Sequence, residues 1–347
     1  MEMSDILEQL SNVCGVAGRE DRVRALMMEM LEPHVDEIRE DKLGNVIGIK
    51  KGSKGTPTLM LAAHMDEIGL MIKNITKDGF IQFSKMGGID DRILISQNVL
   101  IHTDKGVITG VIGSKPPHIL KEEERKKVVE ADELFIDVGA EDKATAQKMG
   151  VRIGDTVGFN VKFSRVAGNS VVGKAFDNRA GCVALIEIMK SLELLKCTVY
   201  AVGTIQEEVG SRGAGVSAFG LNPDVAVAVD TTVAGDVPGV SEAVAPTKMR
   251  KGPCLTVADA GFITHPKVLR WLVDAAEAIS VPYQLETGLR GSTDAARIAL
   301  TREGIPCGVL AIPVRYIHSA VSLLSLDDLN NTVKLGVAAA GTVGEYF

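Results

Sequence analysis

Apolar runs of strand length alternate with longer amphipathic segments from Phe176 to the C-terminus of the chain. The runs at 198–204, 225–229, 255–258 and 307–312 predict strands, and the segments at 180–195, 213–219, 265–279, 293–302 and 326–342 predict helices. Such alternation is typical of strands that lie side by side and are covered by helices on both faces. We therefore predict an α/β fold with a mixed, largely parallel sheet, to which an earlier strand at 58–63 also belongs.

The pattern changes between residues 70 and 165. Short β-like runs such as Leu70–Ile75 and Val107–Ile112 recur there, separated by turn signals such as Lys77-Asp78-Gly79. A charged helix is predicted at 121–129, and a strand at 157–166. We interpret this stretch as a small, β-rich and barrel-like domain, residues 70–165, inserted into a discontinuous main domain of residues 1–69 and 166–347.

Composition narrows the class of protein. The 347 residues carry a formal net charge of −7, which argues against nucleic acid as a partner because that interaction needs a basic surface. We find no apolar run of membrane-spanning length, and the acidic start of the chain does not resemble an export signal. The cysteines form no CxxC pair and mostly lie in apolar runs, which predicts reduced thiols and a cytoplasmic protein. They are Cys14, Cys182, Cys197, Cys254 and Cys307.

Two adjacent carboxylates, Glu207 and Glu208, follow the predicted strand at 198–204. Ligands bind in open α/β sheets at the carboxyl ends of strands. Adjacent side chains on an extended segment point in different directions, so one carboxylate could bind a metal while the other handles a proton. An isolated pair could equally be a solvated acidic turn.

Other candidate metal ligands also fall at strand ends or in loops. Together with Glu208 the set is His64, Asp177, Asp230 and His318. Imidazole mixed with carboxylate suits zinc, cobalt or manganese better than calcium, which prefers oxygen throughout. Two metals would need one carboxylate to bridge them, at roughly 3.5–4 Å. Asp66 is placed to accept the second ring proton of His64. Asp177 could instead cap a helix, and His318 could simply hydrogen-bond a loop.

Several segments resemble the tetrahedral (TET) aminopeptidases, also called the glutamyl aminopeptidase family, in the same order along nearly the whole chain. They are Ala62–Gly69, Ala175–Gly181, Gln206–Gly210, Val229-Asp230 and Arg315–Ser319. The resemblance implies a two-metal aminopeptidase that removes N-terminal residues from short peptides. Asp177 would bridge the metals, His64 and Asp230 would complete one site, and Glu208 and His318 the other. Glu207 would be the general base, and Asp66 would orient His64.

The resemblance also implies metal cofactors and partner subunits. The cofactors would be two divalent metal ions per subunit, zinc or cobalt, with manganese as a further candidate. Residues 70–165 would help to build a tetrahedral homododecamer with inward-facing active sites. The edges of a β-rich domain need covering, which favours such an assembly.

Competing hypotheses remain open from the sequence. Glu207 and Glu208 could be the paired carboxylates of an endoglucanase, although that leaves the histidines without a role. A metal-dependent deacylase or carboxypeptidase would use a similar ligand set, and a metal-binding scaffold would need no base. In the substrate pocket, Arg290 could pair with an acidic first side chain. If Arg290 is instead solvated or paired with Glu286, the pocket would prefer leucine-like residues.

Overall fold

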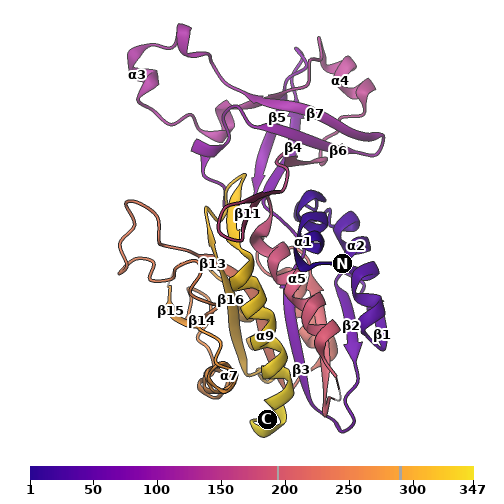
Figure 1. The fold of residues 1–347 in the computed structure, drawn as a ribbon. Coiled ribbons are helices and arrows are strands. Elements are labelled where there is room, and N and C mark those ends of the chain that lie inside the picture. The colour runs from indigo at the N-terminus through magenta and orange to yellow at the C-terminus, as the bar shows by residue number, and fades with distance from the viewer. Residues whose placement is uncertain (194, 289–290) are drawn as a thin grey trace.

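The computed structural model describes residues 1–193, 195–288 and 291–347. The chain forms two parts that lie end to end (Figure 1). One part is a closed barrel of strands, and the other is a large sheet flanked by helices. Both chain termini lie in the sheet part.

The centre of the large sheet is parallel. Its strands run in the order β12 (Cys197–Thr204), β3 (Gly55–His64), β13 (Val225–Val233) and β16 (Cys307–Arg315). Antiparallel strands extend both sides, and β14 pairs with β16 and with β15. The strands outside the centre are β1 (Glu37–Glu40), β2 (Val46–Lys50), β10 (Ser164–Val166), β11 (Ser170–Gly173), β14 (Cys254–Ala258), β15 (Gln284–Thr287) and β17 (Ser322–Ser325), of which β15 pairs in parallel with β14. The predicted α/β class with a mixed sheet is confirmed, and its parallel part occupies the middle.

Helices cover both faces of the sheet. On β3, Leu59 and Leu61 face one apolar core while Met60 and Ala62 face another, as the alternation of side chains along a strand requires. The first core is covered by α1 (Met3–Asn12), α2 (Asp21–Leu31), α5 (Phe176–Ser191), α7 (Pro266–Ala278) and α9 (Leu326–Thr342). The second is covered by α6 (Arg212–Leu221) and α8 (Ala295–Ala299). Burial on both faces explains why the central strands are apolar throughout.

The β-rich stretch closes on itself. Its strands form a barrel in the order β4 (Gly69–Ile75), β5 (Ile81–Met86), β8 (Phe135–Asp137), β7 (Gly106–Gly113), β6 (Asn98–Thr103) and β9 (Thr156–Phe159). Ile72, Phe83 and Ile101 belong to a separate apolar core inside it. The predicted barrel is therefore confirmed. Its closure removes the free edges that were expected to need a covering partner, so that reason for assembly is wrong.

Two local predictions in this stretch are wrong. The charged helix expected at 121–129 is a single turn, α3 (Glu122–Arg125), and its residues are not buried. Without an apolar face to pack, a longer helix gains no tertiary support. The strand expected at 157–166 is divided between β9 in the barrel and β10 in the large sheet, because the chain crosses from one part to the other between them. A second short helix of the barrel part is α4 (Lys143–Met149).

Within the described ranges, none of the helices has both the length and the apolar character needed to cross a lipid bilayer.

Candidate metal centre and active site

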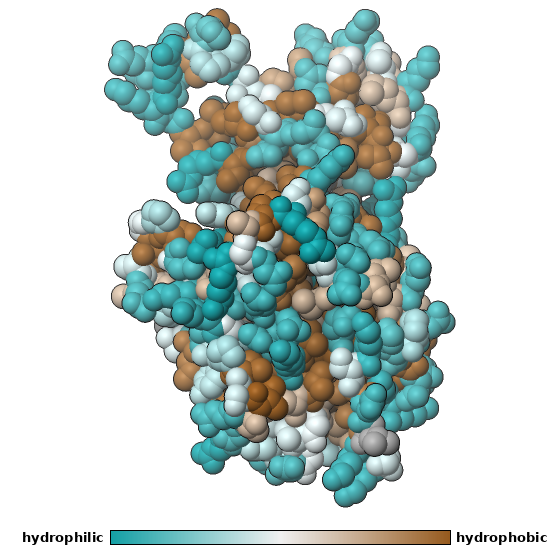
Figure 2. Space-filling view, viewed as in Figure 1, coloured by the Kyte–Doolittle hydropathy of each residue, from teal (hydrophilic) through white to brown (hydrophobic). Residues whose placement is uncertain are grey.

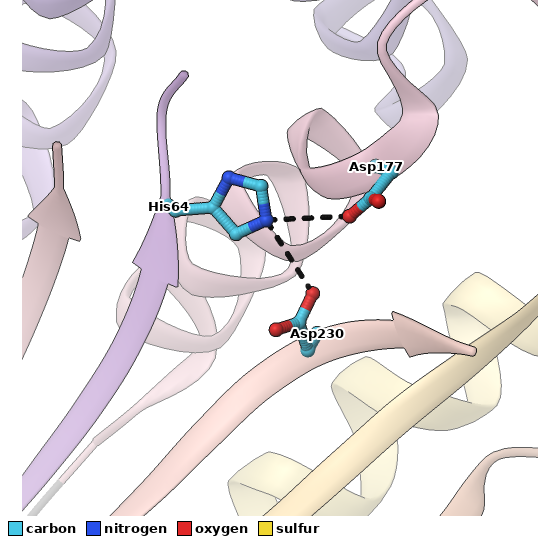
Figure 3. A group of neighbouring side chains, drawn as sticks. All are labelled: His64, Asp177 and Asp230. Carbon is cyan, nitrogen blue, oxygen red and sulfur yellow. Dashed lines mark ion pairs between the residues drawn. The ribbon is translucent and has the colours of Figure 1, made fainter. Parts of the chain in front are cut away.

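Three side chains from three elements converge at the carboxyl end of the parallel strands (Figure 3). His64 is the last residue of β3, Asp230 lies in the neighbouring β13, and Asp177 stands at the start of α5. Nε2 of His64 is 3.2 Å from Oδ1 of Asp177 and 3.7 Å from Oδ1 of Asp230. The strand β13 continues past its predicted end, because residues 231–233 still pair with β16.

A second group shares Asp177 with the first. Oδ2 of Asp177 is 3.3 Å from Nε2 of His318, which lies 3.9 Å from Oε2 of Glu208. In each group one potential ligand atom from every residue lies within 4.8 Å of the others. All the ligand candidates from the sequence are thus brought together, with one oxygen of Asp177 facing each histidine.

Asp177 is held by contacts that the sequence did not predict. Thr231 donates its hydroxyl to Oδ1 of Asp177 at 3.0 Å. The next residue, Asn178, follows a cis peptide bond. Its amide donates to the carbonyl of Val229 and its Oδ1 accepts from the N–H of Gly181, both at 2.9 Å. The start of α5 is therefore fastened to the strand that carries Asp230.

Asp66 lies beside His64, as predicted, but its carboxylate has more contacts than expected. The ring Nδ1 of His64 is 3.2 Å from the backbone oxygen of Asp66 and 3.4 Å from its Oδ1. Oδ1 also accepts the N–H of Glu207, and Oδ2 accepts the N–H of Glu208, each at 3.0 Å. A single buried carboxylate thus joins the end of β3 to the turn that presents both glutamates.

A loop of the barrel part reaches the second group. Nδ1 of His318 is 2.9 Å from the carbonyl oxygen of Gly88, which follows β5. A Cβ atom at Gly88 would stand 3.1 Å from that Nδ1, and one at Gly87 would stand 3.0 Å from Oε2 of Glu208. A side chain at either position would therefore press on a candidate metal ligand. Neither glycine was predicted from the sequence to lie at the site, although a Gly-Gly pair after a β-rich run signals a turn.

The two glutamates have different surroundings. Oε1 of Glu207 accepts the hydroxyl of Ser211 at 3.0 Å, and its Oε2 is 4.0 Å from Nε2 of His64. The Glu207 side chain is 12% exposed and lines a cavity of about 710 Å³, whereas that of Glu208 is 3% exposed. A group that contacts substrate must be reachable from such a cavity, and Glu207 is the one that lines it.

The carboxylates of the cluster are buried close together, which favours a cation beside them. Burial raises the pKa of Glu208 to about 8 and that of Asp230 to about 7, and the charge of Asp177 adds to both. Burial also raises the pKa of Glu207 well above its usual range. Burial alone would raise the pKa of Asp177 too, but hydrogen bonds with His318 and His64 hold it well below its usual range.

One carboxylate oxygen of Glu208 supports a cation site. Oε1 of Glu208 is buried and has no hydrogen-bond partner among the described residues. A buried, unpaired carboxylate oxygen is costly unless a cation or a donor meets it. With nitrogen and oxygen donors on both sides of Asp177, the residues fit divalent metal ions of the zinc or cobalt type.

Arg290, the predicted contact for an acidic substrate side chain, lies outside the described residues.

Comparison with known proteins decides the family. The model of the M42 glutamyl aminopeptidases matches residues 44–335. The chain belongs to this family. It is 36% identical to a lysyl aminopeptidase of Pyrococcus furiosus, over 96% of this chain and 95% of that protein. The predicted resemblance is confirmed, and the chain is a metallo-aminopeptidase, a hydrolase of peptide bonds.

Solved structures of other proteins are also similar to this chain. A TET aminopeptidase of Thaumarchaeota archaeon SCGC AB-539-E09 superposes with a TM-score of 0.95 at 39% identity, covering 99% of each chain. The TET1 peptidase of Pyrococcus horikoshii, which can assemble into a tetrahedron or a large octahedral shell, gives 0.89 at 35% identity, covering 98% of this chain and 99% of that one. A Thermotoga maritima protein described as an endoglucanase gives 0.80 at 34% identity, covering 98% of this chain and 97% of that one.

Proposed function

We propose that this aminopeptidase uses two divalent metal ions bridged by Asp177. The proposal rests on the two carboxylate oxygens of Asp177, which face different histidines. Oδ1 lies 3.2 Å from His64, and Oδ2 lies 3.3 Å from His318. His64 and Asp230 would hold one ion, and Glu208 and His318 the other. Zinc and cobalt suit these donors best, and manganese is a further candidate.

When bound, such ions lower the pKa of water toward neutrality and polarise the carbonyl of the scissile bond. The protein must then move a proton. Glu207 is placed for this role because it lines the cavity and its Oε1 is held by Ser211. Its raised pKa suits a base that takes a proton from the attacking water and returns it to the leaving amine.

Asp66 would position this machinery. Its hydrogen bonds to the N–H groups of Glu207 and Glu208 fix the turn that presents both carboxylates. Its backbone oxygen and Oδ1 face the ring nitrogen of His64 that points away from Asp177. Such contacts set the ring direction of a metal-binding histidine.

The substrate's free N-terminus would be held in the same place. An α-amino group is a cation, and the acidic cluster offers it carboxylate oxygens beside the reacting carbonyl. We therefore expect cleavage of short peptides with unblocked N-termini, and no cleavage of N-acetylated ones.

The endoglucanase alternative is supported by the descriptions of similar proteins and by no feature of the site. It would use Glu207 and Glu208 as the paired carboxylates and would leave His64, Asp230 and His318 without a role. A scaffold protein would have no use for a reachable base at Glu207.

One set of assays tests the proposal. Metal-loaded protein is incubated with free peptides, with the same peptides N-acetylated, and with a soluble β-glucan. We expect release of the first residue from free peptides alone, in step with a content of two metal ions per chain. Cleavage of the acetylated peptides or of the glucan, or full activity with one ion, would contradict the proposal.

We also propose that residues 70–165 form an inserted domain that promotes assembly into a tetrahedral homododecamer. The barrel has its own apolar core, which supports treating it as a unit. Ile119, Val128 and Ile153 expose apolar side chains, and Figure 2 shows apolar areas at this end of the molecule. Light scattering is expected to give a particle far larger than a dimer, and an active monomer would contradict the idea.

We further propose a cytoplasmic location. All the cysteines fall within the described ranges and are free thiols, as expected for a protein of a reducing compartment.

A further inference from the structure

The cavity beside the ligand cluster combines acidic side chains with apolar walls. It has a volume of about 710 Å³ and reaches from Asp230 and Glu207 to β15 and the loop after β14. Val240, Val244 and Pro246 form part of its walls. Among the described residues that line it, none is a lysine or an arginine, and its histidines belong to the ligand cluster.

Glu286 on β15 brings a carboxylate into this cavity. Its Oε1 accepts the hydroxyl of Thr256 at 2.7 Å, and its Oε2 accepts the hydroxyl of Thr232 at 2.9 Å. Thr232 follows the ligand candidate Asp230 by two residues along β13, so both side chains point to the same face, roughly 6.5–7 Å apart. Glu286 therefore lies one strand repeat from the predicted metal centre.

Asp259, after β14, supplies a second carboxylate to the same cavity. It is 8% exposed, and its Oδ1 accepts the N–H of Gly261 at 2.7 Å. Its Oδ2 is buried and meets no hydrogen-bond donor in the described part of the chain. The pKa of Glu286 is raised by burial and further by the charge of Asp259, which places the two carboxylates within electrostatic reach of each other.

Glu286 and the buried Asp259 bring two carboxylates into one cavity, and among the described residues that line it no lysine or arginine meets them. We propose that this cavity receives the side chain of the substrate's first residue, and that Glu286 and Asp259 select a cationic side chain, lysyl or arginyl. The inference rests on the proposed aminopeptidase function and names the class of its substrate.

The chemistry of a lysyl or arginyl side chain matches the cavity along its length. The aliphatic stem packs against the valine and proline walls, while the charged end reaches the carboxylates. Hydrogen bonds between ionised partners are about twice as strong as neutral ones. A glutamyl side chain would place a third negative charge beside two others and is excluded by repulsion.

The test compares chromogenic amides of lysine, norleucine and glutamate with the metal-loaded protein. Norleucine keeps the four-carbon side chain of lysine and lacks its ammonium group. We expect kcat/KM for the lysyl amide to exceed that for the norleucyl amide by about tenfold to a hundredfold, the range for a charged hydrogen bond. The glutamyl amide is expected to be the poorest substrate.

Two variants assign the preference to residues. Glu286→Gln keeps the shape of the side chain and can keep both threonine contacts, because a hydroxyl also accepts a hydrogen bond. Asp259→Asn keeps an acceptor for Gly261. Each is expected to lower the lysyl-to-norleucyl ratio of kcat/KM by about tenfold or more. Glu303→Gln, an exposed change of the same charge after α8, is the matched control and should keep the wild-type ratio.

The outcomes separate this inference from the proposed function. A wild-type protein that cleaves norleucyl or glutamyl amides as well as lysyl amides overturns the inference and leaves the aminopeptidase intact. A lysyl preference that survives in both Glu286→Gln and Asp259→Asn overturns the assignment to these residues. Failure to cleave any of the three amides overturns the proposed function, and this inference with it.

Discussion

The two groups that share Asp177 are built on different kinds of support. The first, which we call the His64 half, consists of His64 and Asp230 on neighbouring parallel strands. The second, the His318 half, consists of Glu208 and His318, which stand on turns after β12 and β16. The His64 side chain is 2% exposed, whereas that of His318 is 40% exposed.

The support of the His318 half comes partly from the barrel. Gly88 contacts the ring of His318, and Gly87 packs against Glu208. Gln206 and His318 have φ values of 55° and 56°, in the left-handed region that residues other than glycine seldom adopt. The His64 half inherits its geometry from the sheet core, while the His318 half depends on two strained turns and a distant loop. We therefore expect the His318 half to hold its metal less firmly.

The largest effect is expected at Glu207, the proposed general base, which belongs to neither metal-binding half. Glu207→Gln removes the proton acceptor without removing a ligand, and general base catalysis contributes typically about 10²–10⁴-fold. Turnover should fall by at least that range while both metals stay bound, as measured by steady-state kinetics and elemental analysis.

The neighbouring substitution is the matched control. Glu208→Gln should lower metal content, because a neutral amide is a much poorer ligand. If Glu207→Gln were metal-free and Glu208→Gln were not, the two roles would be reversed.

The next effect tests whether Asp177 joins the halves. Asp177→Asn should empty both sites, because each uses one oxygen of this carboxylate. Asp230→Asn should empty only the His64 half, and the two variants are compared by metal content per chain. Equal loss of metal in both variants would mean that the two halves do not bind their ions independently.

A smaller and graded effect is expected from chelation. A limiting chelator should remove metal in two steps, first from the more exposed His318 half, as followed by elemental analysis during dialysis. In the metal-free protein the hydrogen bond with Asp177 raises the pKa of His318 to about 10, and burial raises that of Glu208 to about 8. Both groups are therefore protonated below these values, and metal must displace their protons.

The sign of the pH dependence follows from these shifts. Metal affinity should fall as pH is lowered from about 8 to 6, and binding should release protons, which calorimetry in buffers of different ionisation enthalpy can measure. Release of both ions in a single step, or tighter binding at the lower pH, would contradict this picture.

The sequence located candidate residues of both halves, but not the contacts that hold them in place. Strand ends can be located from apolar runs, so His64, Glu208 and Asp230 could be placed at one edge of the sheet. The contacts that fasten them come from residues distant in sequence. Asn178 bonds to Val229, and Gly88 meets His318 across 230 positions of the chain. No local pattern carries that information, because tertiary packing decides which loops meet.

The errors in the fold have a similar cause. The charged segment at 121–129 has good helix formers, but it lacks an apolar stripe to pack, so only α3 remains helical. A single strand was predicted at 157–166 because this stretch is β-rich throughout. Only the topology shows that β9 and β10 belong to different sheets. Local preference could predict each element type, but not which partner each element finds.

The smallest expected effect tests the barrel's contribution directly. In Gly88→Ala the new Cβ would stand 3.1 Å from Nδ1 of His318, so the ring must move by a few tenths of an ångström. Changing a contact that orients a metal ligand typically costs about 10–100-fold in metal affinity, and we expect the lower end here because the displacement is small. The loss should appear only in the His318 half, measured as the second step of a metal titration. Gly220→Ala, where a Cβ meets nothing within 4 Å, is the control and should titrate as wild type. Weakening of the His64 half instead would show that the barrel loop supports the whole centre, and the two halves would then share one source of rigidity.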